Sequence, residues 1–259
     1  MNPQLANLTL SSFPEGSRVL VVGGHGGIGL ALLDQLSHDP VVGELHAWSR
    51  RPNPNPNPNP NPNTTNAIQH TIVDITKEDS IAEAAANLER IDLVIVATGM
   101  LHSVDGNAPE KSLRNINAEN FTESFLTNVI GPTLVAKHLM TRLPRQGRAL
   151  FCALSARVGS IEDNRLGGWY SYRASKAALN QVIKTLSIEM ARTRPDAICV
   201  GLHPGTVDTP LSRPFQKNVP ADTLFTPAHS AACLLQVINN LSLAESGGLF
   251  AFDGKAIPF

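Results

Sequence analysis

A strand, a turn crowded with glycines and a following helix constrain the fold of this chain more than any other feature. Arg18–Val22 is a short run rich in β-branched residues, the segment Gly23–Gly29 holds five glycines, and Ile28–Leu36 is apolar enough for a helix. Glycine permits the tight turn that joins a strand to a helix at close range. A strand, a tight turn and a helix in this order begin a βαβ unit, which predicts a parallel sheet.

The same alternation of short apolar runs and longer amphipathic stretches continues to the end of the chain. We expect further strands at 44–48, 68–73, 92–97, 148–154, 196–202 and 248–252, and helices at 81–88, 118–143, 171–191 and 227–239. The strands are rich in Val, Ile and Leu rather than alternating with polar residues, which is typical of strands buried on both faces. The pattern predicts an α/β protein with a Rossmann fold, in which helices cover both faces of a doubly wound parallel sheet of about seven strands. We see no domain break, so we expect an N-terminal extension over 1–17 and a single domain over 18–259.

Residues 52–63 do not fit this scheme, because they are an uninterrupted alternation of proline and asparagine. Proline lacks an N–H group, and a residue that precedes proline is pushed towards extended conformations. We therefore predict an exposed loop with partial polyproline II character. It is either a flap or partner-binding arm beside the site, or a repeat expansion tolerated in a surface loop because lengthening a loop costs little. We favour the repeat expansion.

Composition and charge exclude several classes of function. With 21 basic and 22 acidic residues the net charge is −1, so we expect no general affinity for nucleic acid or an anionic membrane. The three cysteines form neither a C-x-x-C pair nor a cluster with histidines, so we expect no metal site. No apolar stretch reaches the roughly 20 residues that span a bilayer, and Met1–Ser17 lacks the pattern of a signal peptide. We expect a soluble, cytoplasmic protein.

The glycine cluster matches three known spacings of a dinucleotide-binding turn. Gly24-x-Gly26-x-x-Gly29, Gly23-x-x-x-Gly27-x-Gly29 and Gly23-x-x-Gly26-x-x-Gly29 are all present, so the motif alone does not choose between them. In each, the free N–H groups and the dipole at the helix N-terminus can receive a pyrophosphate. The alternative is a tight turn with no ligand, but the strand before it and the helix after it favour dinucleotide binding.

The end of the second expected strand predicts which dinucleotide binds. Sites that prefer NAD place an acidic residue there to bond the ribose 2′-hydroxyl, whereas this chain has Ser49-Arg50-Arg51. A guanidinium binds a 2′-phosphate through charge-assisted hydrogen bonds, while a carboxylate would repel it. We therefore favour NADP(H) over NAD(H), although ordinary solvated arginines would also fit this position.

Tyr172 and Lys176 are four residues apart, which puts their side chains on one face of a helix. An ammonium near a phenol favours the phenolate and lowers the pKa of the tyrosine from about 10 towards neutrality. Such a tyrosine can act as a general acid or base. The same spacing also arises by chance in helices, so other motifs have to decide its meaning.

Together with Asn128, Ser155 and Pro204-Gly205, these motifs resemble those of the short-chain dehydrogenase/reductase family over residues 18–255, nearly the whole chain. Within the family, the stretch Ser155–Asp163 and the segment Phe252–Lys255 resemble the C-factor-like and sniffer-like carbonyl reductases. The resemblance implies an NADP(H)-dependent oxidoreductase that transfers hydride between the nicotinamide and a small-molecule carbonyl or alcohol.

The resemblance also implies a catalytic set of four residues. Tyr172 would donate the proton to the carbonyl oxygen, and Lys176 would hold the nicotinamide ribose and lower the pKa of Tyr172. Ser155 would hydrogen-bond the substrate oxygen. Asn128 would support a water-linked proton relay to the lysine, although an asparagine that satisfies an irregular helix would fit the same position.

Further positions of the cofactor site follow from the same resemblance. Asp74 and Ile75 would contact the adenine, although an aspartate that caps the next helix is an alternative. Val207 and Thr209 would meet the nicotinamide carboxamide, and His203 is expected to be an ordinary residue at a strand end. The full set expected at the cofactor is Gly23, His25, Gly27, Ile28, Gly29, Ser49, Arg50, Asp74, Ile75, Ala97, Thr98, Gly99, Tyr172, Lys176, Pro204, Gly205, Val207 and Thr209.

The chain departs from the family pattern in three places. Val22 replaces a threonine, Val96–Gly99 replaces an N-N-A-G segment, and Ile161–Trp169 is an apparent insert between Ser155 and Tyr172. We expect the insert to border the substrate pocket. Residues 206–226 are expected to form a substrate lid in which two phenylalanines either pack in the core or face an apolar carbonyl substrate.

Other readings of the chain stay open at this point. The family favours a homodimer or homotetramer built on the helices that carry Asn128 and Tyr172. A regulatory protein that binds the nucleotide with little turnover would share the fold. An epimerase or dehydratase acting on a nucleotide sugar would too, but the chain is short for the substrate domain that such enzymes add.

Overall fold

The computed structural model describes residues 9–52, 67–102, 109–220 and 223–259, so the Pro/Asn segment lies almost wholly outside the described residues. Seven strands form one parallel sheet in the order β3-β2-β1-β4-β5-β6-β9. They are β1 (Ser17–Val22), β2 (Val42–Ser49), β3 (Ile68–Ile72), β4 (Leu93–Val96), β5 (Ala149–Leu154), β6 (Ala197–His203) and β9 (Leu249–Ala251). The predicted doubly wound parallel sheet is confirmed.

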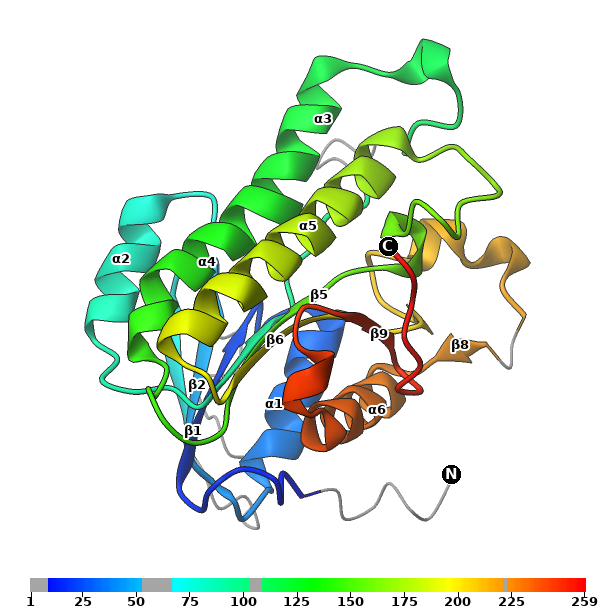
Figure 1. The fold of residues 1–259 in the computed structure, drawn as a ribbon. Coiled ribbons are helices and arrows are strands. Elements are labelled where there is room, and N and C mark those ends of the chain that lie inside the picture. Colours follow the sequence, from blue (N-terminus) through cyan, green and yellow to red (C-terminus); the bar gives the residue numbers. More distant parts are fainter. Residues whose placement is uncertain (1–8, 53–66, 103–108, 221–222) are drawn as a thin grey trace.

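Helices cover both faces of this sheet (Figure 1). They are α1 (Gly27–Ser37), α2 (Glu78–Ala86), α3 (Ala118–Phe125), α4 (Gly131–Leu139), α5 (Tyr170–Thr193) and α6 (Pro227–Asn240). One apolar cluster lies between the sheet and α1 with α6, and a second lies between the sheet and α2, α4 and α5. Strand β1 shows why both faces must be apolar: Val19 and Val21 belong to the first cluster, and Leu20 and Val22 to the second.

The long helix expected over 118–143 is continuous but not uniform. It consists of α3, a π-helical turn over Leu126–Ile130, α4 and a short 3-10 turn over Met140–Arg142. A π turn is rare and is found mostly at functional sites. It lies where the sequence places Asn128.

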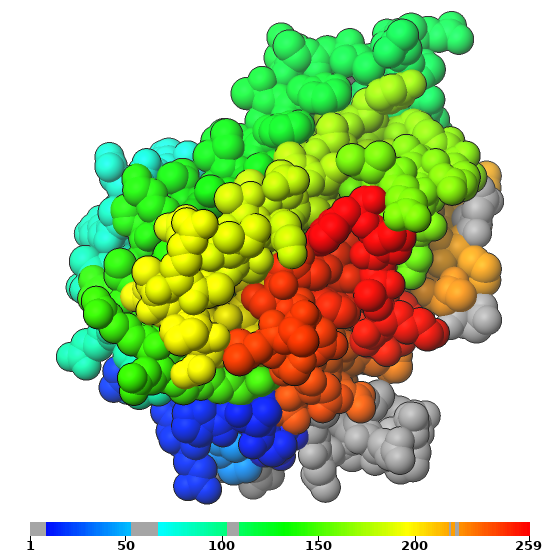
Figure 2. Space-filling model, viewed as in Figure 1, coloured from blue at the N-terminus to red at the C-terminus, as the bar shows by residue number. Residues whose placement is uncertain are grey.

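Residues at the two ends of the chain pack on this body. Leu10 and Phe13 are buried in the cluster of α1 and α6, and the Arg148 guanidinium lies 4.8 Å from the centre of the Phe13 ring. At the other end, the Phe259 carbonyl accepts a hydrogen bond from the Glu162 N–H at 3.1 Å. Figure 2 shows these last residues, in red, lying against the yellow-green segment that precedes α5. The insert before α5 is thus in contact with the chain end.

The expected lid contains two short strands, β7 (Thr206–Val207) and β8 (Leu224–Phe225), that pair with each other beside the main sheet. A 3-10 segment over Arg213–Asn218 lies between them. In the part of the chain that the structure describes, no helix is both long enough and apolar enough to cross a membrane.

Candidate active site

The turn between β1 and α1 requires glycine at several positions. Gly23 has a φ of +92°, and a Cβ on Gly29 would lie 2.2 Å from the Gly23 carbonyl oxygen. The N–H groups of Gly23 and Gly24 both donate to the Trp48 carbonyl oxygen, at 2.8 and 3.1 Å, which fixes the turn to the end of β2. Helix α1 has no side-chain cap at its N-terminus. Its first N–H groups are therefore available to an anion, and the close backbone packing leaves room for a pyrophosphate.

The Pro204–Thr209 segment meets this turn from the other side. A Cβ on Gly27 would lie 2.7 Å from Cγ2 of Thr209, so the two segments are in direct contact. The Pro204 carbonyl oxygen accepts a hydrogen bond from the Ser230 hydroxyl at 2.8 Å, and Gly205 adopts a φ of +81° where a Cβ would strike the Phe225 ring. Val207 is buried.

The segment after β4 also packs against the glycine turn. The Ala97 N–H donates to the Val22 carbonyl oxygen at 2.7 Å, and the Thr98 methyl group would lie 3.0 Å from a Cβ on Gly23. A Cβ on Gly99 would have 3.7 Å of clearance from both Asn128 Oδ1 and Lys176 Nζ. Gly99 therefore separates two of the predicted catalytic side chains without crowding either.

At the end of β2, Ser49 Oγ donates to the Arg51 carbonyl oxygen at 2.9 Å, and Arg50 is exposed. Burial tends to raise the pKa of the Asp74 carboxyl, but two hydrogen bonds from Thr76 and the charge of Arg50 outweigh it and leave this pKa below its ordinary value. Arg50 is thus close enough to β3 and the Asp74 turn to act on a group bound there.

Asp74 and Ile75, which were predicted to contact the adenine, also make contacts within the protein. Asp74 Oδ1 accepts from the backbone N–H and the hydroxyl of Thr76, whereas the N-cap residue of α2 is Lys77, so the alternative in which Asp74 caps that helix is wrong. Ile75 is buried, and its side chain fills the space above Gly131, where a Cβ would lie 2.7 Å from Ile75 Cδ1. The rings of His25 and His70 lie 6.1 Å apart beside the glycine turn.

Asn128 occupies the π turn and is fully buried. Its Oδ1 accepts from the Met100 N–H at 2.8 Å, and its Nδ2 donates to the Met100 carbonyl oxygen at 2.8 Å and to Ser175 Oγ at 3.0 Å. The amide therefore joins the segment after β4 to helix α5. Ser175 Oγ in turn donates to the Tyr172 carbonyl oxygen at 2.8 Å.

Tyr172 and Lys176 lie on one face of α5, as predicted, and both side chains are buried. Lys176 Nζ donates to the Leu154 carbonyl oxygen at 2.8 Å and lies 5.8 Å from the centre of the Tyr172 ring. The Tyr172 hydroxyl has no hydrogen-bond partner among the described residues. It is the group on this face that is free to meet a substrate oxygen.

The prediction that Lys176 lowers the pKa of Tyr172 is wrong for the folded chain. Burial raises the pKa of Tyr172 and lowers the pKa of Lys176 to about 7. Removal from water disfavours both the phenolate and the ammonium, and it is the cause of both shifts. The phenol is therefore kept protonated at neutral pH.

The Ser155 hydroxyl has a hydrogen-bond partner within the protein. A hydroxyl has a single proton to donate, and Ser155 Oγ donates it to Asn180 Oδ1 at 2.6 Å. The next side chain along the chain, Ala156, packs in the apolar cluster with Tyr172. Ser155 thus joins the end of β5 to α5, and a methyl group lies beside the tyrosine.

Several residues around Tyr172 were not predicted from the sequence. The buried members of the cluster are Leu101, Ala156 and Tyr172, and Val158, Trp169, Leu211 and Phe215 pack against them. The insert containing Trp169 was expected at the pocket, but no local pattern singles out Leu101. Of the two lid phenylalanines, Phe215 faces this cluster, whereas Phe225 packs on Phe252 at 4.6 Å between ring centres.

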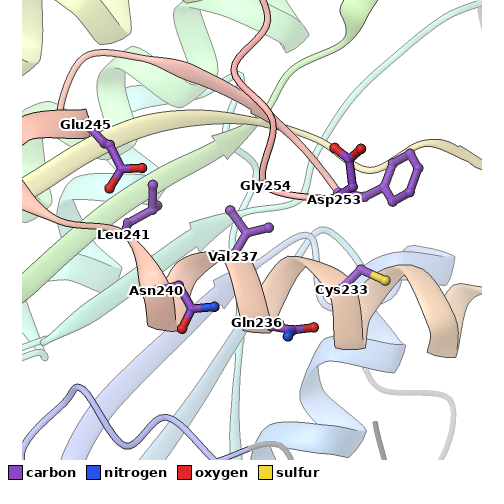
Figure 3. Close-up of a pocket in the computed structure, with 9 residues that line it drawn as sticks. Cys233, Gln236, Val237, Asn240, Leu241, Glu245, Asp253 and Gly254 are labelled. Carbon is purple, nitrogen blue, oxygen red and sulfur yellow. The ribbon is translucent and has the colours of Figure 1, made fainter. Parts of the chain in front are cut away.

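Two other features of the described residues lie apart from these groups. His203, at the end of β6, has an unpaired Nδ1, and burial lowers its pKa to about 4, so it is neutral at working pH. A hollow of about 270 Å³ lies between α6 and the turn after β9 (Figure 3), lined by Cys233, Gln236, Val237, Asn240, Leu241, Glu245, Phe252, Asp253 and Gly254. None of these nine is a predicted site residue. No group of three or more His, Cys, Asp or Glu side chains in the described ranges could hold a metal ion.

The sequence of this chain is similar to those of several oxidoreductases and to that of C-signal over much of its length. The family model for short chain dehydrogenase matches residues 17–220. An uncharacterized oxidoreductase of Schizosaccharomyces pombe is 28% identical over 255 residues, covering 92% of this chain and 96% of the relative. C-signal of Myxococcus xanthus is 30% identical over 149 residues, covering 57% of this chain and 84% of C-signal.

Solved structures share the whole fold. The carbonyl reductase Sniffer of D. melanogaster superposes with a TM-score of 0.79 at 23% identity, covering 95% of this chain and 100% of the other. An NADPH-bound carbonyl reductase from chicken fatty liver gives a TM-score of 0.81 at 25% identity, covering 95% of both chains.

Proposed function

The chain belongs to the short-chain dehydrogenase family, and from that membership we propose that it is an NADP(H)-dependent carbonyl reductase. It would transfer hydride between the nicotinamide and the carbonyl or alcohol group of a small molecule. The observation that carries this proposal is the unpaired Tyr172 hydroxyl beside the buried Lys176, next to Gly99 and the glycine turn.

The residues present fit a dinucleotide. The N–H groups at the start of α1 would hold the pyrophosphate, the Arg50 guanidinium would bind a 2′-phosphate, and Gly99 would let the backbone approach the nicotinamide half. Two of the similar structures are described as NADPH-bound or NADP-bound, which supports the choice of NADP(H). The bound cofactor supplies the hydride and its own charges and hydroxyl groups.

The protein's own groups would then handle the proton. Because burial keeps the Tyr172 phenol protonated, its hydroxyl can donate to a carbonyl oxygen as that oxygen gains negative charge. Lys176 is fixed below it by the Leu154 carbonyl oxygen. Asn128 joins the backbone of Met100 to the Ser175 hydroxyl on α5. In this proposal Ser155 orients the strand end through Asn180 rather than touching the substrate.

The test is a panel of aldehydes, ketones and quinones assayed with NADPH and with NADH at the nicotinamide absorbance. We expect NADPH oxidation with at least one carbonyl, and its loss in Tyr172→Phe while NADPH still binds. An absence of turnover with every carbonyl would refute the proposal.

A second candidate is a nucleotide-binding signalling protein with little turnover, which the similarity to C-signal supports. Its biological effect would survive Tyr172→Phe but not disruption of the glycine turn. The homodimeric or homotetrameric assembly and the cytoplasmic location stay predictions.

A further inference from the structure

The backbone just before α5 adopts a conformation that side chains rarely accept. Trp169 has a φ of 53° and is the one non-glycine residue with positive φ in the described ranges. Gly167 and Gly168 precede it with φ of 63° and 66°, so three consecutive residues lie in the left-handed region. Such strain persists only where surrounding contacts impose it, and it gathers at functional sites.

Glu110 supplies those contacts from a distant part of the chain. Its carbonyl oxygen accepts from the Trp169 N–H at 2.5 Å, and its Oε2 accepts from the N–H and the hydroxyl of Ser171 at 3.1 and 2.8 Å. The Glu110 side chain is only 2% exposed. On the other side, the Arg173 N–H donates to the Trp169 carbonyl oxygen at 2.8 Å, and Arg173 Nε donates to the Gly168 carbonyl oxygen at 3.0 Å.

The strained conformation directs the indole of Trp169 between two other rings. It meets Tyr172 edge-on at 6.2 Å between ring centres, and Phe215 edge-on at 5.3 Å. Phe215 comes from the 3-10 segment of the expected lid, so Trp169 joins the insert, the proposed proton donor and the lid. Leu101, Ala156, Val158 and Leu211 pack around these rings, and the His102 ring lies 6.3 Å from the Phe215 ring between centres.

We propose that Trp169, held by Glu110 as its positioning residue, determines the substrate specificity of this site. The inference rests on the proposed function. The Trp169–Phe215 pair closes one side of the space beside Tyr172, so the site admits apolar carbonyl compounds with a small substituent on that side and excludes bulky ones. Removing the indole opens this side without removing any group that binds the proposed cofactor.

The experiment compares Trp169→Gly with Trp169→Ala in a matched pair of substrates, benzaldehyde and a ketone with two large apolar substituents such as benzophenone. Both variants lose the indole, but only glycine relieves the backbone strain. We expect the ratio of kcat/KM for benzophenone over benzaldehyde to rise about tenfold or more in both. Trp169→Gly should have the higher Tm of the two, and the Kd for NADPH should be unchanged in both.

Two further variants keep the proposal testable if these unfold. Phe215→Ala removes the other ring of the pair and should shift the same ratio in the same direction. Glu110→Ala should shift the ratio as well, and Glu110→Gln, which keeps one acceptor for Ser171, should restore it in part. A purely structural role of Glu110 would lower Tm and leave the ratio unchanged.

The outcomes separate the two proposals. If the wild-type protein reduces carbonyls but the ratio is the same in wild type, Trp169→Gly and Phe215→Ala, the role of Trp169 is refuted and the proposed function stands. If the wild-type protein binds NADPH but reduces no carbonyl, the proposed function fails and this inference fails with it.

Discussion

At the scale of single residues, the orientation of two neighbouring side chains decides how the proposed proton transfer is arranged. Ser155 donates its hydroxyl proton to Asn180, and the methyl group of Ala156 packs beside Tyr172. The substrate oxygen would therefore depend on the tyrosine hydroxyl without a second hydroxyl from β5. Mutation of Ser155 and mutation of Tyr172 should therefore have different effects on stability and on activity.

Ser155→Ala should act mainly on stability. The buried Asn180 carbonyl would lose its hydrogen bond, which costs about 1–3 kcal/mol, and kcat should fall by less than about tenfold. Urea unfolding and steady-state kinetics measure the two effects. The control is a double-mutant cycle with Asn180→Ala, in which the effects on unfolding should be strongly non-additive. A loss of about 10²–10³ in kcat with unchanged stability would instead show that Ser155 binds the reacting oxygen.

Lys176 should make stability depend on pH. Its pKa is about 7 in the folded protein against an ordinary 10.5, because burial disfavours the ammonium. Between these values the unfolded chain binds more protons than the folded one, so this residue makes the protein more stable as pH rises above 7 and imposes its full penalty below 7. The free energy of unfolding of Lys176→Met relative to wild type should therefore fall from pH 7 to pH 9, by up to about 1.4 kcal/mol per pH unit.

The difference between the two proteins is the quantity to measure, by urea unfolding at pH 6, 7, 8 and 9. Burial raises the pKa values of Cys152 and Cys199, which lowers stability near pH 9 in both proteins and cancels in the difference. A difference that stays constant over this range would contradict the lowered pKa of Lys176.

At the scale of elements, the sequence predicted the features that depend on residues close together in the chain. The strands fall within a few residues of their expected ranges because β1, β4, β5 and β6 are apolar on both faces. Tyr172 and Lys176 lie together because helical spacing alone brings them together. The glycine turn follows from the backbone demands of Gly23 and Gly29.

Contacts between segments that are distant in the chain could not be predicted from the sequence pattern. Glu110 is 61 positions from Ser171, and Asn128 is 28 from Met100, so no spacing in the sequence links them. The side to which the Ser155 hydroxyl turns depends on Asn180, 25 positions further on. The depressed pKa of Lys176 likewise arises from burial in the assembled fold.

Replacing either of two glycines in the turn, three residues apart, should have very different effects on stability. A Cβ on Gly29 would lie 2.2 Å from a backbone oxygen, whereas a Cβ on Gly26 would lie 3.3 Å from the same oxygen. Gly29→Ala should cost about 3 kcal/mol or more because backbone has to move, and it should abolish NADPH binding. Gly26→Ala, the matched control, should cost less than about 1 kcal/mol of unfolding free energy. Equal stability of the two variants would show that the turn is looser than its geometry implies.

At the scale of the whole molecule, the sheet brings segments from the entire chain to one edge. The glycine turn follows β1, Arg50 follows β2, Gly99 follows β4, Ser155 follows β5 and the Pro204–Thr209 segment follows β6. In parallel α/β sheets this carboxyl edge is where ligands bind, where the strand order changes direction. The order changes at β1 and β4, which are neighbours in the sheet. A dinucleotide bound across them would contact both halves of the fold and stabilise it as a unit.

Cofactor binding should therefore raise the stability of the whole protein, and more for NADPH than for NADH. A ligand at 100 times its Kd adds about 2.7 kcal/mol, which for a domain of this size is a rise in Tm of about 5–10 °C. Arg50→Ala should reduce the NADPH shift to that of NADH, because it removes the guanidinium that would pair with the 2′-phosphate. Arg51→Ala is the control, since Arg50 and not Arg51 acts on the nearby Asp74. Thermal unfolding with each cofactor measures these shifts, and equal shifts for NADH and NADPH in the wild-type protein would overturn the choice of NADP(H).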